Sequence, residues 1–127
     1  NEVELVISQV EGVAEATVYG VQLDGAEGRV GMAAVVPVDA GGDGAALAAR
    51  VHDACRAALP AYAVPAFVRL LGKLETTGTF KHQKAALRSQ GWRAAGSGDP
   101  VFAFVPGGTA PLTVTAENDG AIAAARW

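Results

Sequence analysis

The segment of the sequence best suited to chemistry is a polar loop that leads into a lysine. It reads Leu-Glu-Thr-Thr-Gly-Thr-Phe-Lys-His-Gln-Lys over residues 74–84, and Lys81 falls at the predicted start of a helix. Backbone amides at a helix start favour anions, and a nearby ammonium adds a mobile positive charge. That combination suits the stabilisation of a phosphate or carboxylate during a reaction. An ordinary solvated lysine beside a threonine-rich turn has the same residue types and spacing.

The charges of the chain are unevenly distributed, although the net charge is only −3. Residues 1–53 carry nine acidic and two basic side chains, whereas residues 54–93 carry seven basic side chains and one acidic one. The basic residues of this segment are Arg56, Arg69, Lys73, Lys81, Lys84, Arg88 and Arg93. A basic segment in an acidic protein indicates an anionic ligand. Solvated surface charge is the alternative for each side chain singly.

Neither the cysteine nor the histidine of the loop forms a recognisable site. Cys55 is the only cysteine, so a disulfide within the chain is impossible and a reducing compartment is expected. Its place on an apolar helix stripe favours a buried small side chain over a nucleophile. His82 has no Cys, His or carboxylate at metal-ligand spacing, and we predict no metal site in this chain.

The hydrophobic pattern predicts an α/β (α+β) fold, with a small mixed sheet of about three main strands flanked by helices. A short two-stranded C-terminal extension should follow, and then a helix with Thr115 as its N-cap. The aromatic residues Tyr62, Phe67 and Phe80 are expected to anchor the core. The predicted strands are residues 13–21, 30–38, 66–71, 101–105 and 111–114, and the predicted helices are 1–11, 47–60, 81–90 and 116–125.

Length and composition predict a single folded domain. The 127 residues are half hydrophobic and only 18% charged, which is typical of a globular chain with a core. No apolar run approaches the roughly 20 residues of a membrane-spanning helix. The acidic start shows no signal peptide, and without an initiator methionine the chain is interpreted as a fragment or processed product. A linker at 91–100 suggests a core at 1–92 and an extension at 93–127.

Residues 74–84 resemble the last core motif of the adenylate-forming enzymes, in the form found in very-long-chain acyl-CoA synthetases and fatty acid transport proteins. The more common form is Pro-x-Thr-x-(Ser/Thr)-Gly-Lys, whereas here Gly78 stands three residues before Lys81. Other segments are similar to the same branch along most of the chain. They are Asn-Glu-Val-Glu at 1–4, Gly-Arg-Val-Gly-Met-Ala-Ala-Val-Val at 28–36, Leu-Pro-Ala-Tyr-Ala-Val-Pro at 59–65, Asp-Pro at 99–100 and Pro-Leu-Thr at 111–113.

This resemblance implies the C-terminal domain of an ATP-dependent acyl-CoA synthetase for long or very long fatty acids. The family's small domain supplies a lysine to the adenylation step, and the motif match makes Lys81 that lysine. The loop that would support it holds Thr76, Thr77, Gly78 and Thr79, and Arg56 and Lys84 are candidate contacts for CoA phosphates. The intact enzyme would use ATP, CoA and Mg²⁺ and would need an N-terminal domain absent here, so this chain alone should be inactive and carry no bound cofactor.

Three alternatives remain open at this point. The same fold could serve an adenylating enzyme that passes its product to a carrier-protein thiol, or one that acts on a bile-acid-like substrate. A stand-alone module could instead bind nucleic acid or an anionic membrane through the basic segment. The acidic balance and the lack of interleaved aromatics argue against nucleic acid. The expected location is cytoplasmic, with possible peripheral association at the inner face of the membrane.

Overall fold

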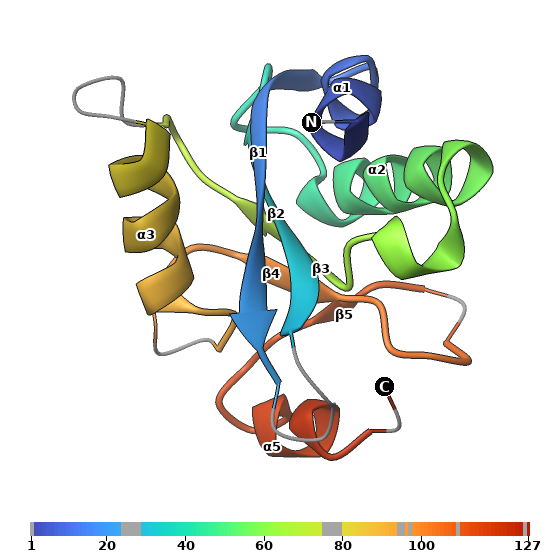
Figure 1. Cartoon of the computed structure of the whole chain (residues 1–127), viewed down its shortest axis with the longest axis vertical. Coiled ribbons are helices and arrows are strands. Elements are labelled where there is room, and N and C mark those ends of the chain that lie inside the picture. Colours follow the sequence, from blue (N-terminus) through green and yellow to red (C-terminus); the bar gives the residue numbers. More distant parts are fainter. Residues whose placement is uncertain are drawn as a thin grey trace.

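The computed structural model describes residues 2–23, 29–74, 80–93, 96, 98–108, 110–125 and 127, and describes the side chains of the helix at 80–90 only from Lys84 onward. Within these residues the strands form one mixed sheet in the order β1-β2-β3-β4-β5 (Figure 1). The two central strands, β2 and β3, are parallel, and the other neighbours are antiparallel. The strands are β1 (Val13–Gln22), β2 (Arg29–Pro37), β3 (Phe67–Leu70), β4 (Val101–Ala103) and β5 (Leu112–Thr113).

Helices cover both faces of this sheet. Figure 1 shows α1 and α2 on one side of β1 and β2, α3 on the other side, and α5 at the end where the chain finishes. The bounds are α1 (Glu2–Ser8), α2 (Gly44–Ala58), the single 3₁₀ turn η1 (Ala61–Ala63), α3 (Phe80–Gln90) and α5 (Asp119–Ala123). Because both faces are covered, β2 is buried continuously from Met32 to Val36, as the apolar run predicted.

The face under α1 and α2, called here the α1/α2 face, is an aliphatic core. Helix α2 begins at a side-chain cap, since Asp43 Oδ1 accepts a hydrogen bond from the Ala46 N–H at 3.1 Å. Pro60 follows its end and cannot continue it. The apolar residues of α2 recur at helical spacing and pack on the strands. The buried residues of this face include Ile7, Leu47, Val51, Cys55, Val68, Leu70 and Phe102.

The opposite face, called the α3/α5 face, has an aromatic centre. Phe67 of β3 is fully buried, and the ring of Trp92 stacks on it at a centroid distance of 4.7 Å. Trp127 approaches the same ring at 5.4 Å and donates a hydrogen bond from its indole nitrogen to the Ile122 carbonyl. Leu87 of α3 belongs to this core as well. The last residue described is therefore part of the same hydrophobic core as the sheet.

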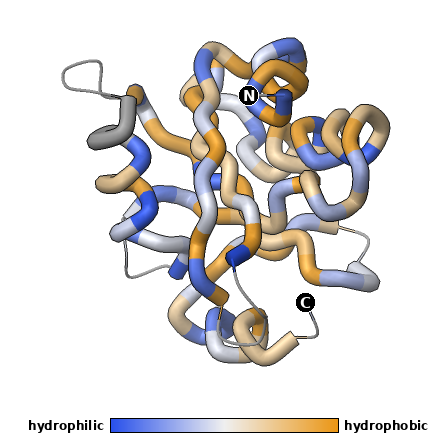
Figure 2. Tube along the Cα trace, viewed as in Figure 1, coloured by the Kyte–Doolittle hydropathy of each residue, from blue (hydrophilic) through white to orange (hydrophobic). Residues whose placement is uncertain are grey.

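The predicted fold class is confirmed, and most predicted elements match to within a few residues. Two C-terminal strands expected in a separate extension join the main sheet, because β4 pairs with β3 along its whole length. The division at residue 92 stays a prediction, although the segment after it shares sheet and core. Figure 2 shows the apolar colours concentrated in the strands and in the helix faces that meet them.

Two local predictions are wrong. Tyr62 is 92% exposed because η1 turns it outward between Pro60 and Pro65, so it does not anchor the core. The final helix starts at Asp119 rather than near 116, and its N-cap is Asn118. Thr115 lies three residues earlier, where it and Asn118 bond to each other, with each backbone N–H donating to the other side chain at 2.8 and 3.2 Å. This reciprocal pattern is that of a capping box, so Thr115 caps the turn that leads into the helix rather than the helix itself. Phe80 has no described side chain, so the prediction for it is not tested.

Candidate functional site

The predicted catalytic lysine lies in the first turn of α3. This helix starts at Phe80, so the backbone of Lys81 occupies its second position, as expected from sequence. Helix α3 ends at Gln90 and is followed by Gly91, whose φ of 66° lies in the left-handed region that favours glycine. The side chain of Lys81 lies outside the described part of the structure, as does the predicted support loop of Thr76, Thr77, Gly78 and Thr79.

The last turn of α3 is joined to the sheet by a buried arginine. Arg69 of β3 is 5% exposed, and its Nε and one terminal nitrogen donate to Asp99 Oδ2 at 3.0 and 2.7 Å. The other terminal nitrogen donates to Gln90 Oε1 at 2.6 Å. A groove of about 380 Å³ lies above it, between α3 and the segment after β3, with Lys73 among its lining residues. The Arg69 charge is already paired with Asp99, so it is not available to an anion in this groove.

The first half of α3 is joined to α1 and β1 by an ion pair. Lys84 Nζ lies 3.2 Å from Glu4 Oε2, and their side chains are only 18% and 16% exposed. The same oxygen accepts hydrogen bonds from the Thr17 hydroxyl at 2.9 Å and the Val18 N–H at 2.8 Å. Burial opposes ionisation of Glu4, but these two hydrogen bonds and the Lys84 ammonium together hold its pKa below the ordinary 4.5.

The basic segment of the sequence is not one surface patch. Arg69 and Lys84 are paired with carboxylates, and Arg93 bonds Asp119 at 3.0 Å while its guanidinium lies 5.0 Å from the centre of the Trp92 ring. Arg56 is exposed on α2, on the side of the sheet opposite α3. The structure therefore does not bring Arg56 and Lys84 together, and their contacts with CoA phosphates stay a prediction.

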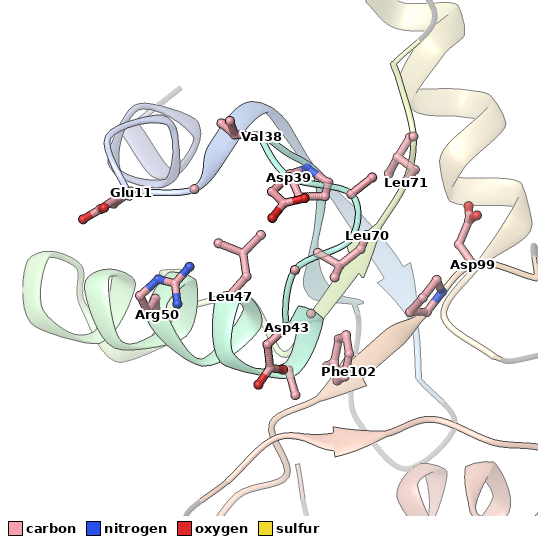
Figure 3. A pocket seen from close by; sticks show the side chains of 18 residues that line it. Glu11, Val38, Asp39, Asp43, Leu47, Arg50, Leu70, Leu71, Asp99 and Phe102 are labelled. Carbon is pink, nitrogen blue, oxygen red and sulfur yellow. The ribbon is translucent and has the colours of Figure 1, made fainter.

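The larger groove of the molecule has the wrong charge for a nucleotide. It encloses about 850 Å³ between the start of α2 and the ends of β2 and β3, where Figure 3 shows the side chains that line it. Four carboxylates and one cation, Arg50, line this space together with apolar residues such as Leu47 and Phe102. The carboxylates are those of Glu11, Asp39, Asp43 and Asp99. A phosphate would be repelled by this set, so we do not place the chemistry here.

The remaining reactive side chains have structural settings. Burial raises the pKa of the Cys55 thiol to about 11, so it is not a nucleophile at neutral pH. His52 stacks on Phe104 at a centroid distance of 3.9 Å, and burial lowers its pKa, with the Arg56 charge contributing. In the described part of the chain no three His, Cys, Asp or Glu side chains lie together to hold a metal ion.

Sequence reasoning missed Glu4 and the partners of Arg69. The signal for Glu4 was available, since it stands three residues before the buried Ile7 and so lies on the inner side of α1. An acidic residue on an inward face implies a partner. The pairing of Arg69 with Asp99 spans 30 positions and has no local signal. None of the described helices is long and apolar enough to cross a membrane.

A small mixed sheet with helices on both faces, and a lysine at the start of the helix after its third strand, defines a compact lysine-bearing α/β domain. Residues 2–81 match the AMP-binding enzyme C-terminal domain, and the chain belongs to this family. The match ends at Lys81, so nearly all of α3 and everything after it lie beyond the residues matched to this family model.

Several of the relatives that the chain matches are named for fatty acids. Human long-chain fatty acid transport protein 5 is 39% identical over the whole chain, which covers 18% of that protein. The medium/long-chain-fatty-acid–CoA ligase FadD6 of Mycobacterium tuberculosis is 43% identical over 80% of the chain and 16% of its own length. The crystal structure of the anthranilate CoA ligase AuaEII with anthranoyl-AMP aligns with a TM-score of 0.61 at 28% identity, over 71% of this chain and 17% of that one. The chain thus spans less than a fifth of these relatives.

Proposed function

We propose that this chain is the C-terminal, lysine-bearing domain of an ATP-dependent acyl-CoA ligase for long or very long fatty acids. The observation that carries the proposal is the family match together with relatives named as fatty acid transport proteins and as a fatty-acid–CoA ligase. In the first step a fatty-acid carboxylate oxygen attacks the α-phosphorus of ATP, and pyrophosphate leaves. In the second step the CoA thiol attacks the acyl carbon of the adenylate, its proton is lost, and AMP leaves.

Lys81 is proposed as the catalytic residue of the first step. Two anions, the carboxylate and the α-phosphate, must approach each other there, and an ammonium between them offsets the repulsion and orients the attacking oxygen. A lysine at the second position of a helix also lies beside backbone N–H groups that favour anions. The role needs a compact flexible cation, which an arginine fork does not reproduce.

The rest of the active site is proposed to lie in an N-terminal domain of the parent enzyme. That domain would bind ATP, the acyl chain and Mg²⁺, and this chain would meet it with the face that carries the first turn of α3. CoA would bind where the two domains meet; of the two residues that sequence assigns to its phosphates, Arg56 is exposed, whereas Lys84 is half-buried and paired with Glu4. This chain alone is expected to be inactive. We place the parent enzyme in the cytoplasm, peripheral at the inner face of the membrane, where long acyl chains partition.

The proposal is tested with the full-length parent enzyme carrying Lys81→Ala, with its two half-reactions measured separately. Fatty-acid-dependent exchange of pyrophosphate into ATP should fall by roughly 10²–10³-fold, the usual cost of removing one group that stabilises developing charge. Thioester formation from supplied acyl-adenylate and CoA should be nearly unchanged. Lys81→Arg should recover little of the lost rate.

Lys73→Ala is the matched control, because Lys73 is an exposed lysine of the segment between β3 and α3. It should leave both half-reactions within about twofold of the unmodified enzyme, as surface substitutions away from a site usually do. Equal adenylation rates in the Lys81→Ala and Lys73→Ala enzymes would remove the catalytic role of Lys81. Loss of thioester formation alone would move Lys81 to the second step.

A further inference from the structure

The Glu4 carboxylate joins three elements around the exposed edge of the sheet. Glu4 is on α1, its hydrogen-bond donors Thr17 and Val18 are on β1, and its cationic partner Lys84 is on α3. Figure 1 shows α1 and α3 on opposite sides of β1, so the carboxylate and the lysine meet across this strand. Because β1 is at the edge of the sheet, its outward N–H groups have no neighbouring strand to bond among the described residues. The Val18 N–H donates to Glu4 instead.

The contact between Glu4 and Lys84 fixes the positions of these two side chains more than it adds to the stability of the fold. An ionised carboxylate that is five-sixths shielded from water costs free energy unless donors surround it. Here the Thr17 hydroxyl and the Val18 N–H donate hydrogen bonds to Oε2 of Glu4, and the Lys84 ammonium forms an ion pair with the same oxygen. Donors on a rigid strand fix where that oxygen lies, and the oxygen in turn fixes where the ammonium of Lys84 lies. Exposed ion pairs lack that restriction.

Helix α3 meets the sheet through a row of side chains spaced three residues apart. Lys84 pairs with Glu4, Leu87 is buried in the core, and Gln90 accepts the hydrogen bond from Arg69. Residues three apart lie on the same side of a helix, one above the other. The backbone of Lys81 is one turn before Lys84 in this row. Within the described side chains of α3, Lys84 is therefore the anchor closest to Lys81.

We propose that Glu4 is a positioning residue for Lys81: by holding Lys84 against β1, it fixes the first turn of α3 and with it the catalytic lysine. The inference rests on the proposed function of Lys81. A displacement of about 1 Å at a reacting group can cost on the order of a hundredfold in rate, so an anchor one turn away matters for catalysis. Glu4 also holds the positive charge of Lys84 at β1, where it does not compete with Lys81 for the same anion.

The first test uses Glu4→Gln in the full-length parent enzyme. Glutamine keeps the size and one acceptor oxygen for Thr17 and Val18, but it loses the charge that holds Lys84. The kcat of adenylation should fall by roughly ten- to a hundredfold, with KM for fatty acid and ATP changed little, because the reacting group and not the substrate is displaced. Glu15→Gln, which removes an exposed carboxylate from β1, is the matched control and should change nothing.

A double-mutant cycle separates positioning from general damage. If Glu4 acts through Lys81, then Glu4→Gln should lower adenylation no further in an enzyme that already carries Lys81→Ala. Lys84→Met should match Glu4→Gln, and Lys84→Arg, which restores a donor to the carboxylate, should recover most of the rate. An additive loss in the cycle would overturn the proposal. So would a Lys84→Met enzyme that adenylates normally but has a raised KM for CoA, since that is the behaviour of a CoA contact.

Amide hydrogen exchange measures how firmly the Glu4–Lys84 contact holds α3, independently of catalysis. In full-length Glu4→Gln enzyme, the amides of residues 80–86 should exchange faster, while those of residues 87–91 keep their protection through Leu87 and Gln90. Exchange could be faster in Glu4→Gln while Lys81→Ala adenylates normally. That result would confirm the contact of Glu4 with Lys84, but it would remove the function proposed for Lys81 and therefore the positioning role of Glu4. A large Lys81→Ala effect with unchanged exchange and rate in Glu4→Gln would overturn the positioning role alone.

Discussion

The two faces of the sheet are held to their helices in different ways. On the α1/α2 face the contacts are mainly aliphatic, with Ile7, Leu47 and Val51 packed on the strands beside the ring of Phe102. On the α3/α5 face an aromatic centre is surrounded by charged pairs, and each ion pair among the described residues involves this side: Arg69–Asp99, Lys84–Glu4 and Arg93–Asp119. Aliphatic packing stabilises a helix but tolerates small shifts, whereas charged pairs add direction.

The ion pairs occur on the face that carries Lys81, the residue proposed to be catalytic. The helix that carries Lys81 has few apolar residues of its own, since Leu87 is its one buried hydrophobic residue within the described side chains. Such a helix gains little from burial and needs other contacts at each end. The pair with Glu4 supplies one near its start, and the contact between Gln90 and Arg69 supplies the other near its end. Position, more than stability, is therefore specified on the face that carries the lysine.

The largest expected effect comes from two neighbours on β3 that point to opposite faces. Phe67 is 0% exposed in the aromatic centre, and Val68 is 1% exposed on the α1/α2 face. Phe67→Ala should lower the free energy of unfolding by about 3–5 kcal/mol, because it removes the ring between Trp92 and Trp127. Val68→Ala should cost about 2 kcal/mol for two buried methyl groups and a small cavity.

Urea unfolding of the 127-residue chain, followed by tryptophan fluorescence, measures both values. The Phe67→Ala variant should also lose part of the native fluorescence signal, since its ring contacts both indoles. Equal losses for the two variants would contradict an aromatic centre that dominates the α3/α5 face.

The next largest effect concerns the buried pair of Arg69 and Asp99, where removing either partner should lower the free energy of unfolding by a different amount. Asp99→Ala leaves a guanidinium that is 5% exposed without its carboxylate, and it should cost about 2–3 kcal/mol. Arg69→Met removes the buried charge itself and fills similar space, so its cost should be smaller, roughly 0–2 kcal/mol. Unfolding free energies of both variants and of the double variant decide this. A larger loss for Arg69→Met than for Asp99→Ala would show that the carboxylate, rather than the guanidinium, is the group that needs its partner.

A smaller effect is expected from acid at the Glu4 contact. Because the folded-state pKa of Glu4 lies below 4.5, its stabilising contribution is complete above that pH and is lost as the pH falls through the lower folded value. Glu4→Gln has no such titration. The difference in unfolding free energy between the unmodified chain and Glu4→Gln should therefore shrink from pH 6 to pH 3. A difference that stays constant over this range would show that the charge of Glu4 does not contribute.

Particular residues show how far sequence could predict this molecule. The helix predicted at 81–90 and the strand predicted at 30–38 follow from local spacing, and the structure has them as Phe80–Gln90 and Arg29–Pro37. The position of Lys81 in the first helical turn also follows from local pattern. The partners of Lys84 and Arg69 could not be predicted, since 80 residues of chain separate Glu4 from Lys84 and periodicity carries no information on such pairs. The prediction that Tyr62 anchors the core was wrong, because the sequence around an aromatic residue between two prolines does not indicate which way the turn faces.

The smallest effect is expected at Tyr19. It tests whether the Tyr19 hydroxyl adds to the polar contacts that hold α3 to the sheet. Tyr19 is 4% exposed on the α3/α5 face, and its hydroxyl has no hydrogen-bond partner among the described residues. Burial raises its pKa, while the nearby Arg69 charge opposes the rise, so the hydroxyl stays protonated at neutral pH. A buried hydroxyl without a partner costs free energy, and Tyr19→Phe should therefore leave stability unchanged or raise it by up to about 1 kcal/mol. Urea midpoints of the two chains provide the measurement. A loss of about 1 kcal/mol or more would show that the hydroxyl bonds the Arg69 guanidinium in solution, and Tyr19 would then support, through Arg69, the contact that Gln90 of α3 makes with the sheet.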